Sequence, residues 1–428
     1  MKVLVIGSGG REHAIALAVS RSPLCTELVC APGNPGMAAL GTCFPVNVSD
    51  PHALLHLAQQ ERADFTIIGP EIPLVNGVVD LFRSEGLRIF GPTAGAAALE
   101  GSKAFSKAIM EKYHVPTAAF GTFHDLASAQ AFLAEHPAPI VVKASGLAAG
   151  KGAIVCMTDT EAHAAIEDML GPKAVFGESG KTVVIEEFME GEEVSLFAVC
   201  DGRDYVLLAS AQDHKRVADG DQGLNTGGMG AYAPAPIATQ SLVAEACRTI
   251  IEPTLVGMRS EGKPYTGVLY VGLMVTSQGP KVVEFNCRLG DPEAQVVLPL
   301  FPGDFLDLLL HAERGELASY SVPKMPVCAS AAVVVVASQG YPGAYKSGLP
   351  VESLDAAIAT KAQILHAGTR MEEGQLVTSG GRVFGVVGLG STLRQALDVA
   401  YAGVAQVRFP GAFYRNDIGK KGLARCLI

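Results

Sequence analysis

Long apolar runs are missing from this sequence of 428 residues. No stretch reaches the roughly 18 consecutive apolar residues of a membrane-spanning helix, so we expect no transmembrane segment and no membrane partner. The opening residues, MKVLVIGSGG, reach glycine after an apolar run that is too short for a signal peptide. These two absences favour a protein of the cytoplasm.

Paired cysteines are missing as well. The nine cysteines include no Cys-x-x-Cys pair, and the closest two, Cys25 and Cys30, have no companion ligands. We therefore expect reduced, mostly buried thiols, as in a cytoplasmic protein. No GxSxG, HExxH or Cys–His arrangement stands out, so positioning and charge neutralisation must carry the rate of any reaction, as in phosphoryl transfer.

Positive charge is scarce relative to negative charge. The 33 Lys and Arg against 43 Asp and Glu give a net charge of −10, which argues against a nucleic-acid partner. Local lysines and helix N-termini can still bind phosphates. Hydrophobic residues make up 49% of the chain and charged residues 18%, which excludes disordered and collagen-like proteins. A chain of this length holds roughly two to four domains.

Strands and helices alternate through the first hundred residues. Strands are expected at 2–6, 27–31, 65–68 and 88–90, and helices at 12–19, 51–61 and 75–85. This rhythm predicts a doubly wound parallel sheet, whose ligands bind at the carboxyl ends of the strands, where the glycine-rich turns occur.

The remainder of the chain indicates α+β units. Short strands at 140–143 and 152–156 flank a glycine-rich loop. Longer strands are expected at 194–200, 205–212, 268–276 and 281–285, and a helix at 241–260 with a kink at Pro253. Beyond the proline-containing linker at 323–326, an apolar strand at 329–337 and a helix at 392–406 form a third region.

The turn Gly7-Ser8-Gly9-Gly10 joins the first strand to the first helix. Backbone N–H groups at such a helix start suit an anion. The turn resembles a dinucleotide fingerprint, but Glu12 stands at the sixth position and no acidic residue ends the second strand. A phosphate site without a dinucleotide is therefore favoured over nicotinamide binding, with a purely structural turn as the alternative.

Two lysines flank the glycine-rich loop of the second region. Lys143 ends one strand, and Lys151 lies in the loop that leads to the next strand. Such a loop can close over phosphates as a lid, with two ammonium groups to neutralise them. It is not a Walker loop, because the chain returns as a strand. A flexible surface hairpin with solvated lysines is the alternative.

Alternation along the segment 281–288 predicts a metal and phosphate site. One face carries Glu284, Asn286 and Arg288, and the other carries the apolar side chains of Val283, Phe285 and Cys287. Two oxygen ligands suit Mg²⁺ that bridges phosphates, and the guanidinium suits a transferring phosphoryl group. A structural ion pair on an edge strand is the alternative.

Two further segments carry polar groups at turns. The acidic stretch after the strand 182–186 could hold a nucleoside or be an ordinary surface turn. The segments QDHKR (212–216) and NTGGMG (225–230) form a glycine-rich polar loop that suits close approach to a ligand. We interpret His214 within it as a hydrogen-bonded structural histidine in preference to a general base.

Taken in order, these motifs resemble the glycinamide ribonucleotide synthetase family, also called phosphoribosylamine–glycine ligases. The carrying segments span nearly the whole chain: GSGGREH, APGNPG, IIGPEIPLVNGVVD, FGPTAGAAALEGSKAFSK, VVKASGLAAGKG, VIEEFMEGEE, QDHKR, NTGGMGAYAP, YTGVLYVGLM, EFNCRLGDPE, GYPG, HAGT and SGGRV.

The resemblance implies three domains. These are an N-terminal doubly wound domain at 1–101, an ATP-grasp domain at 102–325 with a mobile lid at about 120–190, and a small α+β domain at 326–428. It also implies that glycine and 5-phosphoribosylamine are joined through glycyl phosphate at the expense of ATP, with Mg²⁺ or Mn²⁺. The expected state is a stand-alone cytoplasmic monomer, in transient contact with the preceding enzyme of purine synthesis.

The resemblance further implies a role for each motif residue. ATP contacts are expected from Lys103, Lys143, Gly146, Gly150, Lys151, Gly152, Glu186, Phe188 and Glu193. Metal ligands are expected at Glu284 and Asn286, and catalytic groups at Arg288, Asp213 and Lys215. Substrate contacts are expected from Gly9, Gly10, Asn225, Gly227, Asp291 and Glu293.

Two positions depart from the family pattern. Ser145 replaces an aspartate that is frequent in the lid loop, and Ser8 replaces an asparagine in the first loop. The alternatives are another ATP-grasp carboxylate–amine ligase, a purine-pathway carboxylase that uses bicarbonate, a nicotinamide oxidoreductase, or a non-catalytic binding protein.

Overall fold

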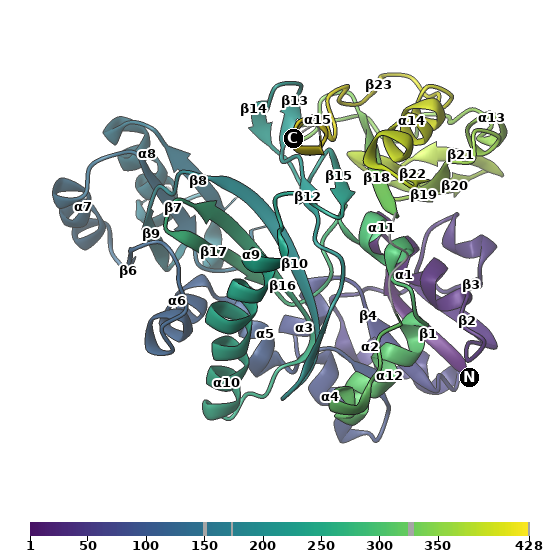
Figure 1. Ribbon diagram of the computed structural model, residues 1–428, viewed down its shortest axis with the longest axis horizontal. Helices are drawn as coiled ribbons and strands as arrows, with labels where there is room; N and C mark the ends of the chain where they lie inside the picture. Colours follow the sequence, from purple (N-terminus) through teal and green to yellow (C-terminus); the bar gives the residue numbers. More distant parts are fainter. Residues whose placement is uncertain (149–151, 173, 324–328, 427–428) are drawn as a thin grey trace.

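The N-terminal region folds into the expected parallel sheet in the computed structural model, which describes residues 1–148, 152–172, 174–323 and 329–426 (Figure 1). The strand order is β3-β2-β1-β4-β5. The strands are β1 (Lys2–Gly7), β2 (Glu27–Pro32), β3 (Thr42–Cys43), β4 (Phe65–Ile68) and β5 (Ile89–Phe90). The helices are α1 (Gly10–Ser20), α2 (Pro51–Gln60), α3 (Glu71–Val75), α4 (Val78–Ser84) and α5 (Ala94–Gly101).

Burial of both faces of this sheet explains the continuous apolar pattern of its strands. Val3 and Val5 pack into one core cluster, whereas Leu4 and Ile6 pack into another. All four side chains are fully buried. The glycine turns follow at the carboxyl ends of the strands, as the sequence predicts.

A small antiparallel sheet with its own core forms the lid subdomain, at one end of the molecule in Figure 1. Its strand order is β6-β9-β7-β8. After α6 (Lys103–Lys112), its elements are β6 (Phe120–Phe123), α7 (Leu126–Glu135), β7 (Ile140–Ala144), β8 (Ala153–Cys156), α8 (Asp159–Leu170), a 3₁₀ turn (Gly177–Gly180) and β9 (Val183–Glu187). The expected hairpin around the glycine-rich loop is β7–β8.

The central antiparallel sheet has the order β11-β10-β16-β17. Its strands are β10 (Glu192–Asp201), β11 (Tyr205–Leu207), β16 (Thr266–Thr276) and β17 (Gly279–Asn286). The accompanying helices are α9 (Gln240–Ala246), a π-helical segment (Cys247–Ile251), α10 (Glu252–Ser260), α11 (Ala294–Val297) and α12 (Phe305–Arg314).

The helix expected at 241–260 is present as α9, the π-helical segment and α10 in direct succession, and Pro253 lies in the turn that follows the π-helical segment. One local expectation for this region is wrong. The strand expected at 205–212 ends at Leu207, and Gln212–Asp213 form the separate strand β12 in another sheet.

The last sheet joins strands from both sides of the linker. Its order is β12-β15-β18-β22-β19, with β23 paired to β18. The strands are β12 (Gln212–Asp213), β15 (Gly230–Ala233), β18 (Ser330–Ser338), β19 (Gln363–His366), β22 (Arg382–Gly390) and β23 (Ala412–Phe413). The remaining elements are the hairpins β13 (Arg216–Ala218)–β14 (Gln222–Asn225) and β20 (Thr369–Glu372)–β21 (Gln375–Thr378), and the helices α13 (Asp355–Ile358), α14 (Leu393–Val404) and α15 (Lys420–Cys426).

The polar loop between β12 and β15 therefore begins and ends in a sheet whose middle strand, β18, comes from the C-terminal region. In the described part of the chain, no helix has both the length and the apolar character needed to cross a membrane.

Candidate active site

Most of the expected site residues line one cleft of about 510 Å³, bounded by the lid, the central sheet and the loops of the last sheet. This volume is typical of a small-ligand site. The lining includes Lys103, Lys143, Gly152, Glu186, Phe188, Glu193, Asp213, Lys215, Asn225, Gly227, Glu284, Asn286, Arg288, Asp291 and Glu293. Among the described residues, Gly9, Gly10 and Gly146 lie outside this lining, while Gly150 and Lys151 fall outside the described ranges.

Glu284 and Asn286 project together from the end of β17. The Asn286 amide lies 3.4 Å from a Glu284 carboxylate oxygen. Burial opposes ionisation of Glu284, but Lys215, Lys143 and Lys103 hold its pKa below the usual value. Across the described residues, no group of three or more His, Cys, Asp or Glu side chains is arranged to hold a metal. A carboxylate and an amide oxygen are a donor pair that suits a divalent ion, which would take its other ligands from substrate phosphates and water.

A β-bulge at Val283 alters the apolar face expected for this strand. Gly272 pairs with Glu284 and Leu273 pairs with Val282, which leaves Val283 as the extra residue. Val282 is buried beside Phe285, whereas Val283 lines the cleft. The Val283 carbonyl accepts a hydrogen bond from Lys143 Nζ at 3.0 Å. The expectation that Val283 belongs to the core face is thus wrong, because strict alternation cannot anticipate a bulge.

The Glu186 side chain lies between two ammonium groups at the base of the lid. Lys143 Nζ is 2.8 Å and Lys107 Nζ is 3.3 Å from its carboxylate oxygens. Lys107 is almost fully buried, and burial lowers its pKa to about 8. The sequence interpretation missed Lys107, although it lies one helical turn after Lys103 on α6.

Acidic groups crowd the opposite part of the cleft. Burial raises the pKa of Asp213 to about 7, and the neighbouring carboxylates add to the effect, although Lys215 opposes it. Lys215 forms an ion pair with Glu193. Glu293 is buried and accepts a hydrogen bond from Ser195 Oγ at 3.3 Å. A carboxyl group that titrates near neutrality can exchange a proton with an amine.

Arg288 is held by two carboxylates that the sequence interpretation missed. Its guanidinium lies 2.8 Å from Glu100 and 3.4 Å from Glu71. The Arg11 guanidinium donates a hydrogen bond to the backbone carbonyl of the next residue, Leu289, at 3.3 Å. Arg288 therefore forms ion pairs, and it lines the cleft as well.

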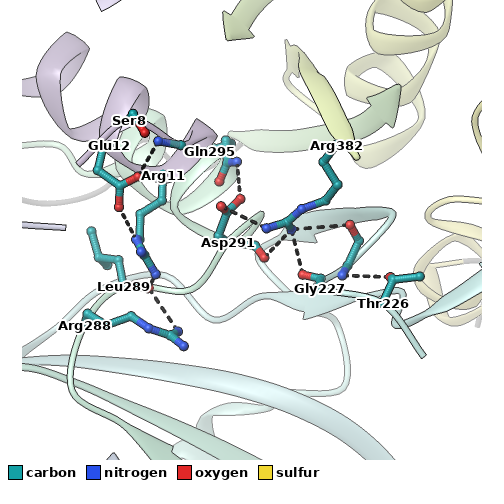
Figure 2. Close-up of polar contacts among 12 residues, drawn as sticks. Ser8, Arg11, Glu12, Thr226, Gly227, Arg288, Leu289, Asp291, Gln295 and Arg382 are labelled. Carbon is teal, nitrogen blue, oxygen red and sulfur yellow. Dashed lines mark hydrogen bonds and ion pairs between the residues drawn. The ribbon is translucent and has the colours of Figure 1, made fainter. Parts of the chain in front are cut away.

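The Gly7–Gly10 turn is filled by Glu12. The Gly9 N–H donates to the Glu12 carboxylate at 2.6 Å, which caps α1 (Figure 2). Arg11 neutralises the same carboxylate at 2.6 Å. Glu12 therefore occupies the position that a dinucleotide fingerprint leaves to glycine, and it restricts the anion site expected at this turn.

His214 is satisfied on both ring nitrogens. Nδ1 lies 3.3 Å from the Gly230 carbonyl, and Nε2 accepts the Gly419 N–H at 3.3 Å. Burial lowers its pKa to about 4. These contacts agree with the expectation of a structural histidine.

Arg382, at the start of β22, is a further cleft residue that was not assigned from sequence. It pairs with Asp291 at 3.0 Å and binds the Gly227 carbonyl at 2.7 Å (Figure 2). The SGGRV segment that contains it indicates a glycine-rich turn but no partner, because Asp291 lies far away in the sequence.

Comparison with known proteins gives matches to one family along nearly the whole chain. Family models for phosphoribosylglycinamide synthetase match residues 1–100 (N domain), 101–294 (ATP-grasp domain) and 331–421 (C domain). The phosphoribosylamine–glycine ligase of Caulobacter vibrioides is 49% identical over 424 residues, covering 99% of both chains. The chain belongs to the phosphoribosylamine–glycine ligase family.

Solved structures agree with this family assignment. The crystal structure of phosphoribosylamine–glycine ligase from Thermotoga maritima has a TM-score of 0.84 and 34% identity, covering 98% of this chain and all of that one. A biotin carboxylase domain from Hydrogenobacter thermophilus, in complex with MgADP and bicarbonate, has a TM-score of 0.72 at 18% identity, covering 96% of this chain and 91% of that one. The latter likeness shows the fold alone. The ATP-grasp fold of this family binds ATP with a divalent cation and acts on small molecules.

Proposed function

We propose that this protein joins glycine to 5-phosphoribosylamine with ATP, giving glycinamide ribonucleotide, ADP and phosphate. The observation that carries the proposal is the end-to-end match to phosphoribosylamine–glycine ligases at 49% identity. The cleft supports it, since it brings Glu284, Asn286 and several lysines beside Asp213, a carboxyl group that titrates near neutrality.

ATP is proposed to bind between the lid and the central sheet. Lys103 and Lys143 would contact its phosphates under the loop that contains Gly146, Gly150, Lys151 and Gly152. Backbone groups of Glu186 and Phe188 would meet adenine, and Glu193 would hold the ribose. Glu284 and Asn286 would bind Mg²⁺ or Mn²⁺, which supplies charge neutralisation between the phosphates when bound.

The reaction would proceed in two displacements. The glycine carboxylate attacks the γ-phosphorus, ADP leaves, and Arg288 neutralises charge on the transferred group. The ribosylamine nitrogen then attacks the glycyl carbonyl, phosphate leaves, and the amine gives up a proton. Asp213, with a pKa of about 7, is proposed to accept that proton, and Lys215 to fix its orientation.

The substrate loops would surround the reacting carbonyl. Asn225, Gly227, Asp291 and Glu293 are proposed to line the glycine and amine site. Gly9 and Gly10 would approach the ribose phosphate closely, although the Gly9 N–H already donates to Glu12. A monomer of the cytoplasm, with transient contact to the enzyme that supplies the ribosylamine, completes the proposal.

A glycine-dependent ADP assay, with phosphoribosylamine generated in place, tests the proposed function. We expect ADP release only when both substrates are present, and loss of turnover in Glu284→Ala with near-normal folding. ADP release with bicarbonate in place of glycine and the amine would instead assign a carboxylase. Full turnover of Glu284→Ala would remove the metal assignment.

A further inference from the structure

Two C-terminal segments that the proposed reaction does not use, GYPG (340–343) and SGGRV (379–383), meet at Gly227 in the loop between β12 and β15. The Gly227 N–H donates to the Tyr341 hydroxyl at 3.0 Å. The Gly227 carbonyl accepts a hydrogen bond from Arg382 Nη1 at 2.7 Å. Backbone groups on both sides of Gly227 are thus held by the C-terminal region.

The Arg382 guanidinium also binds the neighbouring Asp291 turn (Figure 2). Nη1 donates to the Asp291 carbonyl at 2.7 Å, and Nη2 lies 3.0 Å from the Asp291 carboxylate. The other carboxylate oxygen of Asp291 accepts from Gln295 Nε2 at 2.8 Å. Both oxygens of Asp291 therefore have fixed donors, one from β22 and one from α11.

Close packing around Gly227 and Gly381 leaves no room for a side chain at either position. A Cβ atom on Gly227 would lie 3.1 Å from Arg382 Cζ, so the guanidinium lies directly against the loop backbone. A Cβ atom on Gly381 would lie 2.2 Å from the Tyr341 ring, so the two C-terminal segments also pack on each other. Glycine is the residue that permits both contacts.

We propose that Arg382 is a positioning residue, which together with Tyr341 fixes the Gly227 peptide and the Asp291 carboxylate in one geometry for the acyl-acceptor step. The inference rests on the proposed function, since it assigns the Asp291 and Gly227 loops to the glycine and amine site. Arg382 serves the two carbonyls through Nη1 and the carboxylate through Nη2, and the single nitrogen of a lysine does not reproduce this spacing.

The test compares Arg382→Ala, Arg382→Lys and Tyr341→Phe with wild type. Arg370→Ala is the matched control, because Arg370 is also C-terminal but forms an exposed pair with Glu372 at 2.7 Å. We measure KM for glycine, for phosphoribosylamine and for ATP, together with kcat and Tm. In Arg382→Ala the half-buried Asp291 carboxylate loses its ion-pair partner, so kcat/KM for glycine or the amine should fall about 30-fold.

Arg382→Lys should recover little of this loss, while KM for ATP stays within about twofold of wild type in every variant. Tyr341→Phe should lower kcat/KM for glycine or the amine by a smaller factor. In the double variant, kcat/KM should fall by less than the product of the two single effects. A loss confined to Tm, or an equal loss in ATP affinity, would overturn the proposal in favour of a general structural role.

Direct contact between Arg382 and substrate would give a different outcome. In that case Tyr341→Phe and Arg382→Ala would act independently, which also overturns a positioning role. The activities of wild type and Arg370→Ala distinguish failure of the proposed function from failure of the inference about Arg382. If both lack glycine-dependent ADP release, the proposed function fails and the inference fails with it. If both are active and Arg382→Ala is too, only the inference fails.

Discussion

The surroundings of Asp213 bring its pKa into the range that the proposed proton transfer requires. Burial raises its pKa to about 7, so the proton-accepting form grows as the pH rises through 7. We expect kcat to rise over this range in wild type, and Asp213→Asn to lose about 100-fold in kcat together with the pH dependence. Pre-steady-state product formation between about pH 5.5 and 9 measures this. If kcat of Asp213→Asn still rose with pH at the same midpoint as wild type, Asp213 would not be the group that accepts the proton.

Stability should change in the opposite direction for the same substitution. Because the pKa of folded Asp213 lies above that of the unfolded chain, its ionisation weakens folding as the pH rises from about 4 to 7. Asp213→Asn removes that penalty, so the variant should melt at a higher temperature than wild type at pH 8. A stabilised but inactive variant would separate the chemical role from a folding role.

The sequence predicts residues of the site well where chemistry and local spacing agree. Glu284, Asn286 and Arg288 follow from alternation along a single strand. The partners of Arg288, by contrast, are Glu71 and Glu100, and the partner of Asp291 is Arg382. Such pairs depend on tertiary packing, which a single sequence does not specify.

At the scale of elements, Gly146 belongs to the base of the lid. A Cβ atom there would lie 2.8 Å from the Ser179 backbone, and the Gly146 N–H donates to the Ser179 carbonyl at 3.1 Å. We expect Gly146→Ala to displace the loop from the 3₁₀ turn, at a cost of about 1–3 kcal/mol, and to raise KM for ATP roughly tenfold. Steady-state kinetics at saturating glycine and amine measure the change.

Gly177→Ala is the control for this substitution. Nothing lies within 4 Å of its added Cβ, but its φ of +54° imposes backbone strain, worth about 1 kcal/mol. If both variants raise KM for ATP equally, general strain in the lid is responsible and the specific contact with Ser179 is not.

Regular elements were predictable because their signals are local. Four strands of the parallel sheet and the β7–β8 hairpin follow from apolar runs and glycine turns, whereas the two-residue edge strand β3 was not expected. The bulge at Val283 and the π-helical segment at Cys247–Ile251 were not, since each adds one residue to a regular pattern without a distinctive residue type.

At the scale of the whole molecule, two histidines join the N-terminal and C-terminal regions. The His366 N–H donates to His13 Nδ1 at 2.8 Å, and Asn34 bonds the His366 carbonyl at 3.0 Å. Burial lowers the pKa of His13 to about 3 and that of His366 to about 4. Both rings are neutral in the folded protein at physiological pH.

Stability should therefore fall as the pH drops below about 6.5, where the unfolded histidines begin to take up protons and the folded ones do not. Each histidine contributes a slope of about 1.4 kcal/mol per pH unit until its folded pKa is reached. His13→Gln should flatten this slope between about pH 6 and 4, as measured by urea unfolding. The exposed His52→Gln should leave it unchanged, and an unaltered slope in His13→Gln would exclude His13 as the cause.

The three-region architecture could be predicted from the order of the motifs, but the mixed sheet could not. Strands β12 and β15 pair beside β18, about a hundred residues later in the chain. Contacts over such a separation leave no periodic signal in the sequence, so β12 was interpreted as the end of a longer strand.

That separation also sets an order of events during synthesis on the ribosome. When residues 212–233 emerge, β15 has no neighbour on the side that β18 will occupy, and Gly227 lacks both Tyr341 and Arg382. The core that contains Val3 and Val5 also includes Val333 and Val387, so the first sheet completes its packing only with the last quarter of the polypeptide. Gly227 and Asp291 likewise reach their arrangement in the structure only after Arg382 has left the ribosome.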